Sequence, residues 1–395
     1  MFRFVYKRTM FLRLALRKPF RWISLFFLIW IYRTIFIASD DGGLAAGLQI
    51  FSLTGMFFLV YRRWPRCISR LTRTNMISIN TLLLFYGYAL LSVLWAYKPF
   101  FACFMVVQNF VFILLTFWMF SLLDSFRQIE KALVYFLLIV AIFSAIGARL
   151  IGHFSLFIHL LQTGSVSALC VAYCFGEWIK ENKDKRRKCF LRNSMICGFI
   201  LLITSTSSGA NASAIAGMGA AMFFCGKAFW GVLIITAGVL TWFFRDQMMD
   251  LLLIIMPGKT RESVESVTGR ERLWNDILYF ARERPLFGWG FACVERVVSE
   301  KGSVLSPDAH NNYLGFYGSL GFVGCIFAGI HLFSSLSSFI LQSKKLGFTG
   351  LTAAMVTALF NGYSYGFLSG KGCIITISYF AIITVGYHFL RVQRK

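Results

Sequence analysis

The stretch Pro99–Ser121, PFFACFMVVQNFVFILLTFWMFS, decides the fold class of this chain. It contains no Asp, Glu, Lys or Arg, and it exceeds the roughly 20 mostly apolar residues that a helix needs to cross a bilayer. The whole sequence shares this character, because 57% of its 395 residues are hydrophobic and only 14% are charged. A soluble domain has about 25% charged residues. We therefore predict an all-α polytopic membrane protein.

Further apolar runs of similar length lie on both sides of this stretch. They predict about twelve transmembrane helices, at residues 20–38, 43–61, 76–96, 99–121, 132–150, 155–178, 194–209, 211–226, 228–244, 311–340, 348–367 and 372–390. With twelve spans, the clusters of Lys and Arg fall on one side of the membrane, which the positive-inside rule assigns to the cytoplasm. These clusters are residues 1–21, 62–73, 180–192, 344–345 and 391–395. Both termini are then cytoplasmic, and the first apolar run is expected to be an uncleaved span.

The net charge of +23 would also suit a protein that binds nucleic acid. The basic residues, however, occur in short bursts between apolar runs and form no single stripe, which disfavours that function. The ten cysteines include no C-x-x-C pair and lie mostly in apolar runs, where cysteine behaves as a small hydrophobic residue. We therefore expect no metal site and no cofactor.

One segment, residues 245–310, breaks this pattern. It carries nine Lys/Arg against ten Asp/Glu, and it is expected on the periplasmic side because long loops cross the membrane regardless of charge. Asp246–Met256 is predicted to be an amphipathic interfacial helix. Glu271–Glu283 is predicted to be a second helix, followed by a turn and a polar stretch. The chain then divides into an N-terminal bundle (1–244), this catalytic loop, and C-terminal helices (311–395).

Four short motifs occupy the second half of this loop and the apolar run that follows it. They are TGR at residues 268–270 with Leu273-Trp274, ERPLFGWGF at 283–291, AHNNYL at 309–314, and GSLGFVG at 318–324. In this order they resemble the O-antigen ligase and O-antigen polymerase superfamily of bacterial envelope enzymes. The resemblance is specific over roughly residues 265–330 and weaker over the rest of the chain.

This resemblance implies a GT-C-like membrane fold and a metal-independent glycosyltransferase of the bacterial inner membrane. Such enzymes transfer an oligosaccharide from an undecaprenyl diphosphate carrier to a glycan acceptor at the periplasmic face. The acceptor is a second carrier-linked glycan or lipid A-core, and a chain-length regulator protein is a further candidate partner. Arginine at membrane level suits this chemistry, because its guanidinium binds phosphate oxygens bidentately and stays charged.

Arg270 is the first candidate for clamping the leaving diphosphate, an interaction that would lower the barrier as negative charge develops. Arg272 and Arg284 are further candidates for substrate binding. The alternative for Arg270 is structural, in which it caps a helix or pairs with Glu271 or Glu265.

His310 is the second catalytic candidate. An imidazole, whose unperturbed pKa is about 6.5, can take the proton of an acceptor hydroxyl or donate a hydrogen bond to a phosphate. Asn311 and Trp274 are candidates for substrate binding, although tryptophan also belongs at membrane interfaces by default. Asp41 is a rival general base, because a carboxylate could accept the same proton. Its plainer alternative is a solvated turn beside Gly42.

The sequence departs from the family at residues 205–211, STSSGAN, where members often carry an arginine after a serine. Arg149 and Arg33, each near the outer end of an expected span, are candidate substitutes, since ionisable residues at that depth usually have a partner or a function. Ser208 could hydrogen-bond phosphate or sugar. Small residues of this kind could equally serve close helix packing.

Three functions follow from these patterns. The first is a polymerase that joins carrier-linked repeat units, favoured by the Ser/Thr-rich stretch and by LSVLW at residues 91–95. The second is a ligase that passes finished O-antigen to lipid A-core. A transporter or flippase is the alternative of another class, since twelve spans is also a common transporter count. Transporters tend to have related halves, and this sequence shows no repeated halves.

Overall fold

The computed structural model describes residues 28–29, 42–61, 77–150, 160–205, 207–233, 236, 268–302, 309–370 and 372–393. The bundle helices are α3 (Gly42–Tyr61), α5 (Ile77–Leu91), α6 (Pro99–Ser121), α7 (Phe126–Leu150), α8 (Leu160–Lys180), α9 (Lys185–Thr204), α10 (Ser208–Phe224), α16 (Asn312–Leu346), α17 (Thr349–Asn361) and α18 (Ile374–Gln393). Shorter elements are the 3-10 helix η2 (Ser92–Trp95) and the helices α14 (Thr268–Glu283) and α15 (Val294–Lys301). Within the described ranges no strand occurs, which confirms the all-α class.

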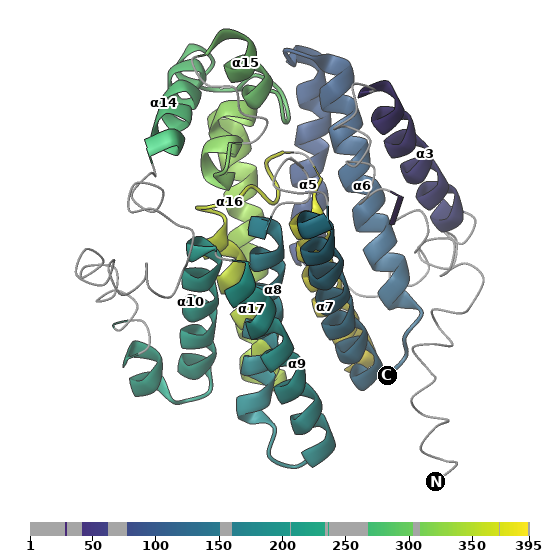
Figure 1. The fold of residues 1–395 in the computed structure, drawn as a ribbon, viewed down its shortest axis with the longest axis vertical. Helices are drawn as coiled ribbons and strands as arrows, with labels where there is room; N and C mark the ends of the chain where they lie inside the picture. The colour runs from purple at the N-terminus through teal and green to yellow at the C-terminus, as the bar shows by residue number, and fades with distance from the viewer. Residues whose placement is uncertain are drawn as a thin grey trace.

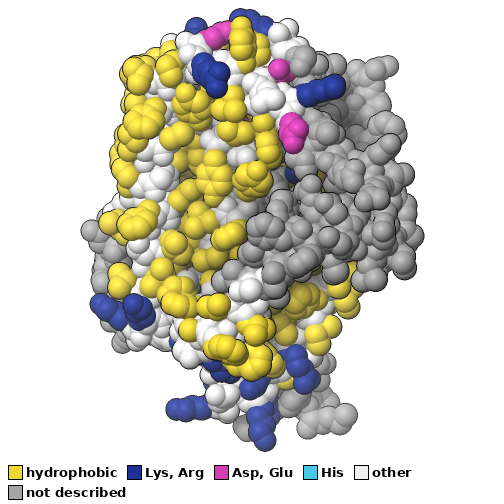
Figure 2. Space-filling model, turned by 90° about the vertical axis from the view of Figure 1, so that its left-hand side faces the viewer, with side chains coloured by type: hydrophobic (Ala, Val, Ile, Leu, Met, Phe, Trp, Pro, Cys, Tyr) yellow, Lys and Arg dark blue, Asp and Glu magenta, His cyan; other side chains and the backbone are white. Residues whose placement is uncertain are grey.

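The long helices run roughly along one axis, and α14 and α15 cover one end of the bundle (Figure 1). The turn between α8 and α9 lies at the opposite end. On the face shown in Figure 2, apolar side chains cover much of the bundle. Lys and Arg gather at the α8–α9 end, whereas the α14–α15 end carries charges of both signs.

Five helices in the described part of the chain are long and apolar enough to cross a membrane. They are Ile77–Trp95, Pro99–Ser121, Phe126–Ala148, Asn312–Leu346 and Ile374–Val392. Two shorter apolar helices, Ala46–Tyr61 and Thr349–Asn361, accompany them. The chain is therefore a multi-pass membrane protein, while the total of twelve spans stays a prediction.

The predicted spans agree unevenly with these helices. The run 99–121 coincides with α6, and the run 76–96 with α5 and η2. The predicted span 348–367 is wrong at its end, because α17 stops at Asn361 and residues 362–370 form turns and bends. The predicted span 20–38, apart from residues 28–29, and the predicted interfacial helix Asp246–Met256 lie outside the described residues.

Two amphipathic helices, α14 and α15, form the segment that covers one end of the bundle. α14 buries Leu273, Ile277 and Phe280, the face that its three- and four-residue spacing predicts. The sequence was expected to continue as a polar stretch after this helix, and the structure instead forms α15. That helix buries Val294 and Val298 against α14 and α16, since the same spacing gives it one apolar face.

α15 is held on the bundle by the connection between η2 and α6. The hydroxyl of Tyr97 donates a hydrogen bond of 2.9 Å to the carboxylate of Glu300, and the ammonium of Lys98 forms an ion pair with the same carboxylate. Hydrogen bonds from Lys98 and Tyr97 hold the pKa of Glu300 below its usual range. The backbone N–H of Tyr97 also donates to the carbonyl of Trp289, at 2.8 Å.

A break in α16 joins two of the sequence motifs. Gly321 has φ 67° and ψ −166° and interrupts the helix, and the turn 285–290 occupies the gap. Four backbone hydrogen bonds join turn and helix: Phe322 to Pro285 (2.8 Å), Val323 to Leu286 (3.2 Å), Trp289 to Gly318 (3.1 Å) and Gly290 to Ser319 (2.8 Å), the N–H donor named first. The motifs ERPLFGWGF and GSLGFVG are therefore two sides of one contact.

An ionic cluster lies near the opposite end of the bundle. Arg187 of α9 donates hydrogen bonds to Glu130 of α7 (2.6 and 2.8 Å), to Glu177 of α8 (2.6 Å) and to Glu181 (2.6 Å). Glu177 also accepts the backbone N–H of Gly350 in α17, at 2.8 Å. Glu130 and Glu177 are almost fully buried. One guanidinium and its partners thus tie four helices together.

Candidate functional site

Arg270 lies in the first turn of α14 and lines a small cavity of about 30 Å³. The other lining residues come from α8 (Leu161, Ser165), from the start of α10 (Ser207, Ser208, Gly209) and from the segment after α17 (Ser364, Tyr365). Hydroxyl groups predominate, and Arg270 is the one cation among these lining residues. The cavity holds about one water molecule, so a larger ligand requires the lining side chains to move outward.

The beginnings of three helices meet at this cavity. Ser207 caps α10, its hydroxyl accepting the N–H of Ala210 at 3.4 Å, while α8 and α14 contribute residues from their first two turns. A helix N-terminus carries about half a positive charge and exposes N–H donors, which favours anions. α10 also approaches the segment after α17 closely, because a Cβ built on Gly209 would lie 2.4 Å from the hydroxyl of Ser364. The combination is typical of an anion-binding site.

Buried polar side chains adjoin the lining residues. The amide oxygen of Asn361 accepts hydrogen bonds from Ser165 (3.2 Å) and Ser364 (3.3 Å), and the amide nitrogen of Gln162 donates to the hydroxyl of Tyr365 (2.6 Å). Among the described residues, the amide nitrogen of Asn361 and the amide oxygen of Gln162 have no hydrogen-bond partner. Buried polar groups are nearly always satisfied by protein or water. These two groups are thus available to water or to a substrate.

His310 lies just before α16, on the Tyr365 side of the cavity. The His310 and Tyr365 rings meet edge to face with centroids 6.1 Å apart. The backbone of His310 has φ 49°, a left-handed conformation that is uncommon for residues other than glycine and that clusters at functional sites. The following helix is fixed to the same segment, because the side-chain oxygen of Asn312 accepts the N–H groups of residues 367, 368 and 369 at 3.0 to 3.1 Å. The structure thus brings Arg270 and His310 to one region.

Two other predicted residues position the His310 segment. The indole N–H of Trp274 donates to the carbonyl of Ala309 at 3.1 Å, and its ring packs edge to face against Tyr363. The side-chain oxygen of Asn311 accepts the N–H groups of Tyr313 and Leu314, so it caps α16. Whether either side chain also contacts substrate stays a prediction.

The remaining arginines of α14 lie apart from this cavity. Arg272 is exposed and does not line it. Arg284 follows the other end of α14, about 21 Å from Arg270 along the chain at 1.5 Å per helical residue. The guanidinium of Arg284 donates to the carbonyl of Trp95 at 3.3 Å and lies 4.2 Å over the ring of Trp289. Arg284 therefore belongs to a different surface.

Residues 205–211, which lack the arginine that family members often carry, contribute to this cavity. Ser207 and Ser208 of this stretch line the same cavity as Arg270 of another helix. Ser208 thus lines the cavity, as a substrate-binding role requires. Asp41 and Arg33 lie outside the described residues. Arg149 is in the last turn of α7, and its side chain also lies outside the described part of the chain.

Sequence reasoning missed Gln162, Ser165, Asn361, Ser364 and Tyr365. The signal was present, because these polar side chains stand inside the apolar runs 155–178 and 348–367. Polar residues within expected spans usually face the protein interior or a water-filled cavity.

Comparison with known proteins identifies one family over part of the chain. Residues 194–329, which contain Ser208, Arg270 and His310, match the protein family described as O-antigen ligase. No curated protein matches the chain. Over this segment, about a third of its length, the chain is similar to the superfamily of O-antigen ligases and polymerases.

Proposed function

We propose that this protein is a glycosyltransferase that polymerises undecaprenyl-diphosphate-linked repeat units at the periplasmic face of the bacterial inner membrane. The observation that carries this proposal is the cavity in which Arg270 meets the hydroxyl-bearing starts of α8 and α10 beside His310. An anion-binding centre next to a titratable imidazole suits a reaction in which a diphosphate leaves and a hydroxyl attacks.

The proposed step uses the residues of this region as follows. The acceptor hydroxyl attacks the anomeric carbon of the donor, the bond from that carbon to the diphosphate oxygen breaks, and a new glycosidic bond forms. The imidazole of His310 takes the hydroxyl proton. Arg270 and the N–H groups at the helix starts stabilise the negative charge that develops on the diphosphate. Ser207, Ser208 and Ser364 offer hydroxyls to phosphate or sugar oxygens.

A ligase that passes glycan to lipid A-core is the second candidate. The specific observation in its favour is that the matched family is described as O-antigen ligase. The two enzymes share the donor and the chemistry and differ in the acceptor, so a product analysis separates them.

The test is polysaccharide banding on gels from a strain that lacks this gene. The strain is complemented with wild type, Arg270→Ala, His310→Ala or Arg282→Ala at matched membrane expression. Arg282 is an exposed arginine of the same helix α14 and serves as the control. A polymerase gives long chains with wild type and Arg282→Ala, and core bearing a single repeat with the other two variants.

Other outcomes decide against parts of the proposal. Bare core together with polymer that accumulates on the carrier identifies a ligase. Long chains with both Arg270→Ala and His310→Ala refute the assignment of the site, whatever the acceptor is.

A further inference from the structure

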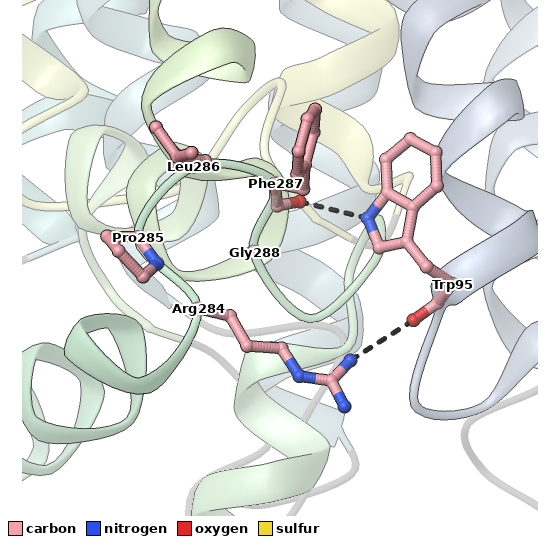
Figure 3. A pocket seen from close by; sticks show the side chains of 6 residues that line it. All are labelled: Trp95, Arg284, Pro285, Leu286, Phe287 and Gly288. Atoms are coloured by element: carbon pink, nitrogen blue, oxygen red, sulfur yellow. Dashed lines mark hydrogen bonds between the residues drawn. The ribbon is translucent and has the colours of Figure 1, made fainter.

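A second and larger cavity, of about 480 Å³, lies at the far end of α14 from Arg270. We call it the Trp95 groove. It is lined by Trp95, Arg284, Pro285, Leu286, Phe287 and Gly288, which Figure 3 shows arranged around the turn after α14. The wall is almost entirely carbon apart from one guanidinium. A groove of this composition suits an amphiphile that has a hydrocarbon chain and an anionic head.

The groove adjoins exposed apolar side chains of two helices that are candidates to span the membrane. Leu286 and Phe287 in its wall are more than half exposed. Leu94, next to Trp95, is 83% exposed, and Phe100 at the start of α6 is 94% exposed. Both residues belong to, or directly adjoin, helices that are long and apolar enough to cross the membrane. A lipid chain can therefore reach the groove from the bilayer without passing through water.

Arg284 provides the charge. Its guanidinium lies over the ring of Trp289. It also donates one hydrogen bond to the carbonyl of Trp95 (Figure 3). Within the described parts of the chain, no carboxylate lies within ion-pair distance of it. Further N–H donors of the guanidinium can thus bind a phosphate, which arginine recognises through two parallel hydrogen bonds.

The groove is also rigid. The indole N–H of Trp95 donates to the carbonyl of Phe287 at 3.0 Å. Gly288, with φ 67°, lies so close to α16 that an added Cβ would stand 2.5 Å from the backbone of Ser319. A wall fixed in this way loses little conformational freedom when a ligand binds, which favours affinity.

Polymerisation requires a second lipid-linked substrate at some distance from the reacting centre. The acceptor attacks through a hydroxyl at the sugar end that is remote from its own diphosphate, so its lipid head must lie about one repeat unit away from the donor diphosphate. Arg270 and Arg284 are about 21 Å apart along α14. That separation matches the length of a short oligosaccharide.

We propose that the Trp95 groove binds the acceptor substrate, with its isoprenoid chain along Leu286 and Phe287 and its diphosphate on Arg284. This inference rests on the proposed polymerase function. It assigns two carrier lipids to one protein molecule, the donor at Arg270 and the acceptor at Arg284.

Native mass spectrometry of the purified full-length protein in detergent, titrated with undecaprenyl diphosphate, tests the proposal. Wild type should bind two lipids. Arg284→Glu should weaken one of the two binding events about tenfold or more, since a charge-assisted hydrogen bond is lost and a like charge is added. The control Arg282→Glu, two residues away on the same helix, should still bind two. Leu286→Trp fills the groove without changing charge, and it should also lose one lipid.

The outcomes separate this inference from the proposed function. Two lipids retained by both Arg284→Glu and Leu286→Trp would overturn the groove assignment. Equal displacement of the Arg284-dependent lipid by phosphatidylglycerol would also overturn it, because the groove would then hold any anionic bilayer lipid. If Arg270→Glu retains two lipids while Arg284→Glu loses one, the donor site is wrong and the groove stands.

Discussion

Replacing Gly321 by alanine probes the contact between the turn 285–290 and the break in α16 with a single methyl group. Gly321 has φ 67°, and an added Cβ would lie 2.3 Å from the carbonyl oxygen of Leu286. With ψ −166°, this backbone lies in a region that essentially only glycine occupies, and it costs an L-residue about 1–3 kcal/mol. The clash is with backbone rather than with a flexible side chain, so the turn itself has to move.

The size of the effect follows from the hydrogen bonds that depend on this fit. Four backbone hydrogen bonds join turn and helix, and each contributes about 1 kcal/mol net. Weakening one or two of them in addition to the conformational cost gives a loss of about 3 kcal/mol. At about 2 °C per kcal/mol for a large domain, the Tm should fall by about 6 °C.

The control is Gly329→Ala in the same helix, where a Cβ would meet nothing within 4 Å. Alanine is a better helix former than glycine by about 0.5–1 kcal/mol, so this variant should equal or exceed wild type in Tm. The assay is thermal unfolding of detergent-purified protein, followed by tryptophan fluorescence. Equal Tm values for the two variants would refute the argument, because the break would then need neither a positive φ nor the close approach of the turn.

Three further predictions concern other parts of the molecule. Arg187→Met leaves buried carboxylates without their cation and should lower the free energy of unfolding by about 3–5 kcal/mol. Arg127→Ala, at an exposed ion pair, should lower it by about 1 kcal/mol or less. Chemical or thermal unfolding of the two variants measures the difference. Glu300 has a lowered pKa, so its contribution is present above the unfolded pKa of about 4.3 and is lost as pH falls through the folded value. Wild type and Glu300→Gln should therefore differ in Tm at pH 7 and converge at acidic pH, and a persistent difference would contradict this. Trp274→Phe removes the hydrogen bond to the carbonyl of Ala309, which should misplace His310 and reduce polymer synthesis about tenfold. The Tm should stay close to that of wild type. Unchanged polymer synthesis would show that this hydrogen bond does not position the site.

The sequence predicted the parts of this protein that depend on local periodicity. The apolar run 99–121 became α6, and the spacing of Leu273, Ile277 and Phe280 gave the buried face of α14. α15 was missed because its apolar face is only eight residues long and is interrupted by charges. The break at Gly321 was missed because hydropathy does not report a backbone conformation that is stabilised by a distant turn.

The candidate site was predictable in its charged residues and in Ser208, but not in the hydroxyls of α8 and of the segment after α17. Arg270 and His310 were identified from motifs, and the structure brings their segments to one region. Arg284 was grouped with Arg270 because the two are close in sequence, yet a rigid helix holds them at opposite ends. Ser165 and Ser364 come from runs far apart in sequence, and only the packing of α8, α10 and α17 shows that they meet.

The cluster around Arg187 bears on how deep the cavity lies in the membrane. The hydrophobic effect does not fix how far one helix is shifted along its neighbour in a membrane, because lipid is as apolar as the helix side chains. Glu177 locks the far end of α8 to three other helices, and Leu161 at the cavity is about 24 Å away along the same helix. A sliding motion of α8 would have to break this cluster. The height of the proposed reacting centre is therefore set at the opposite end of the bundle, by an arginine remote from the cavity.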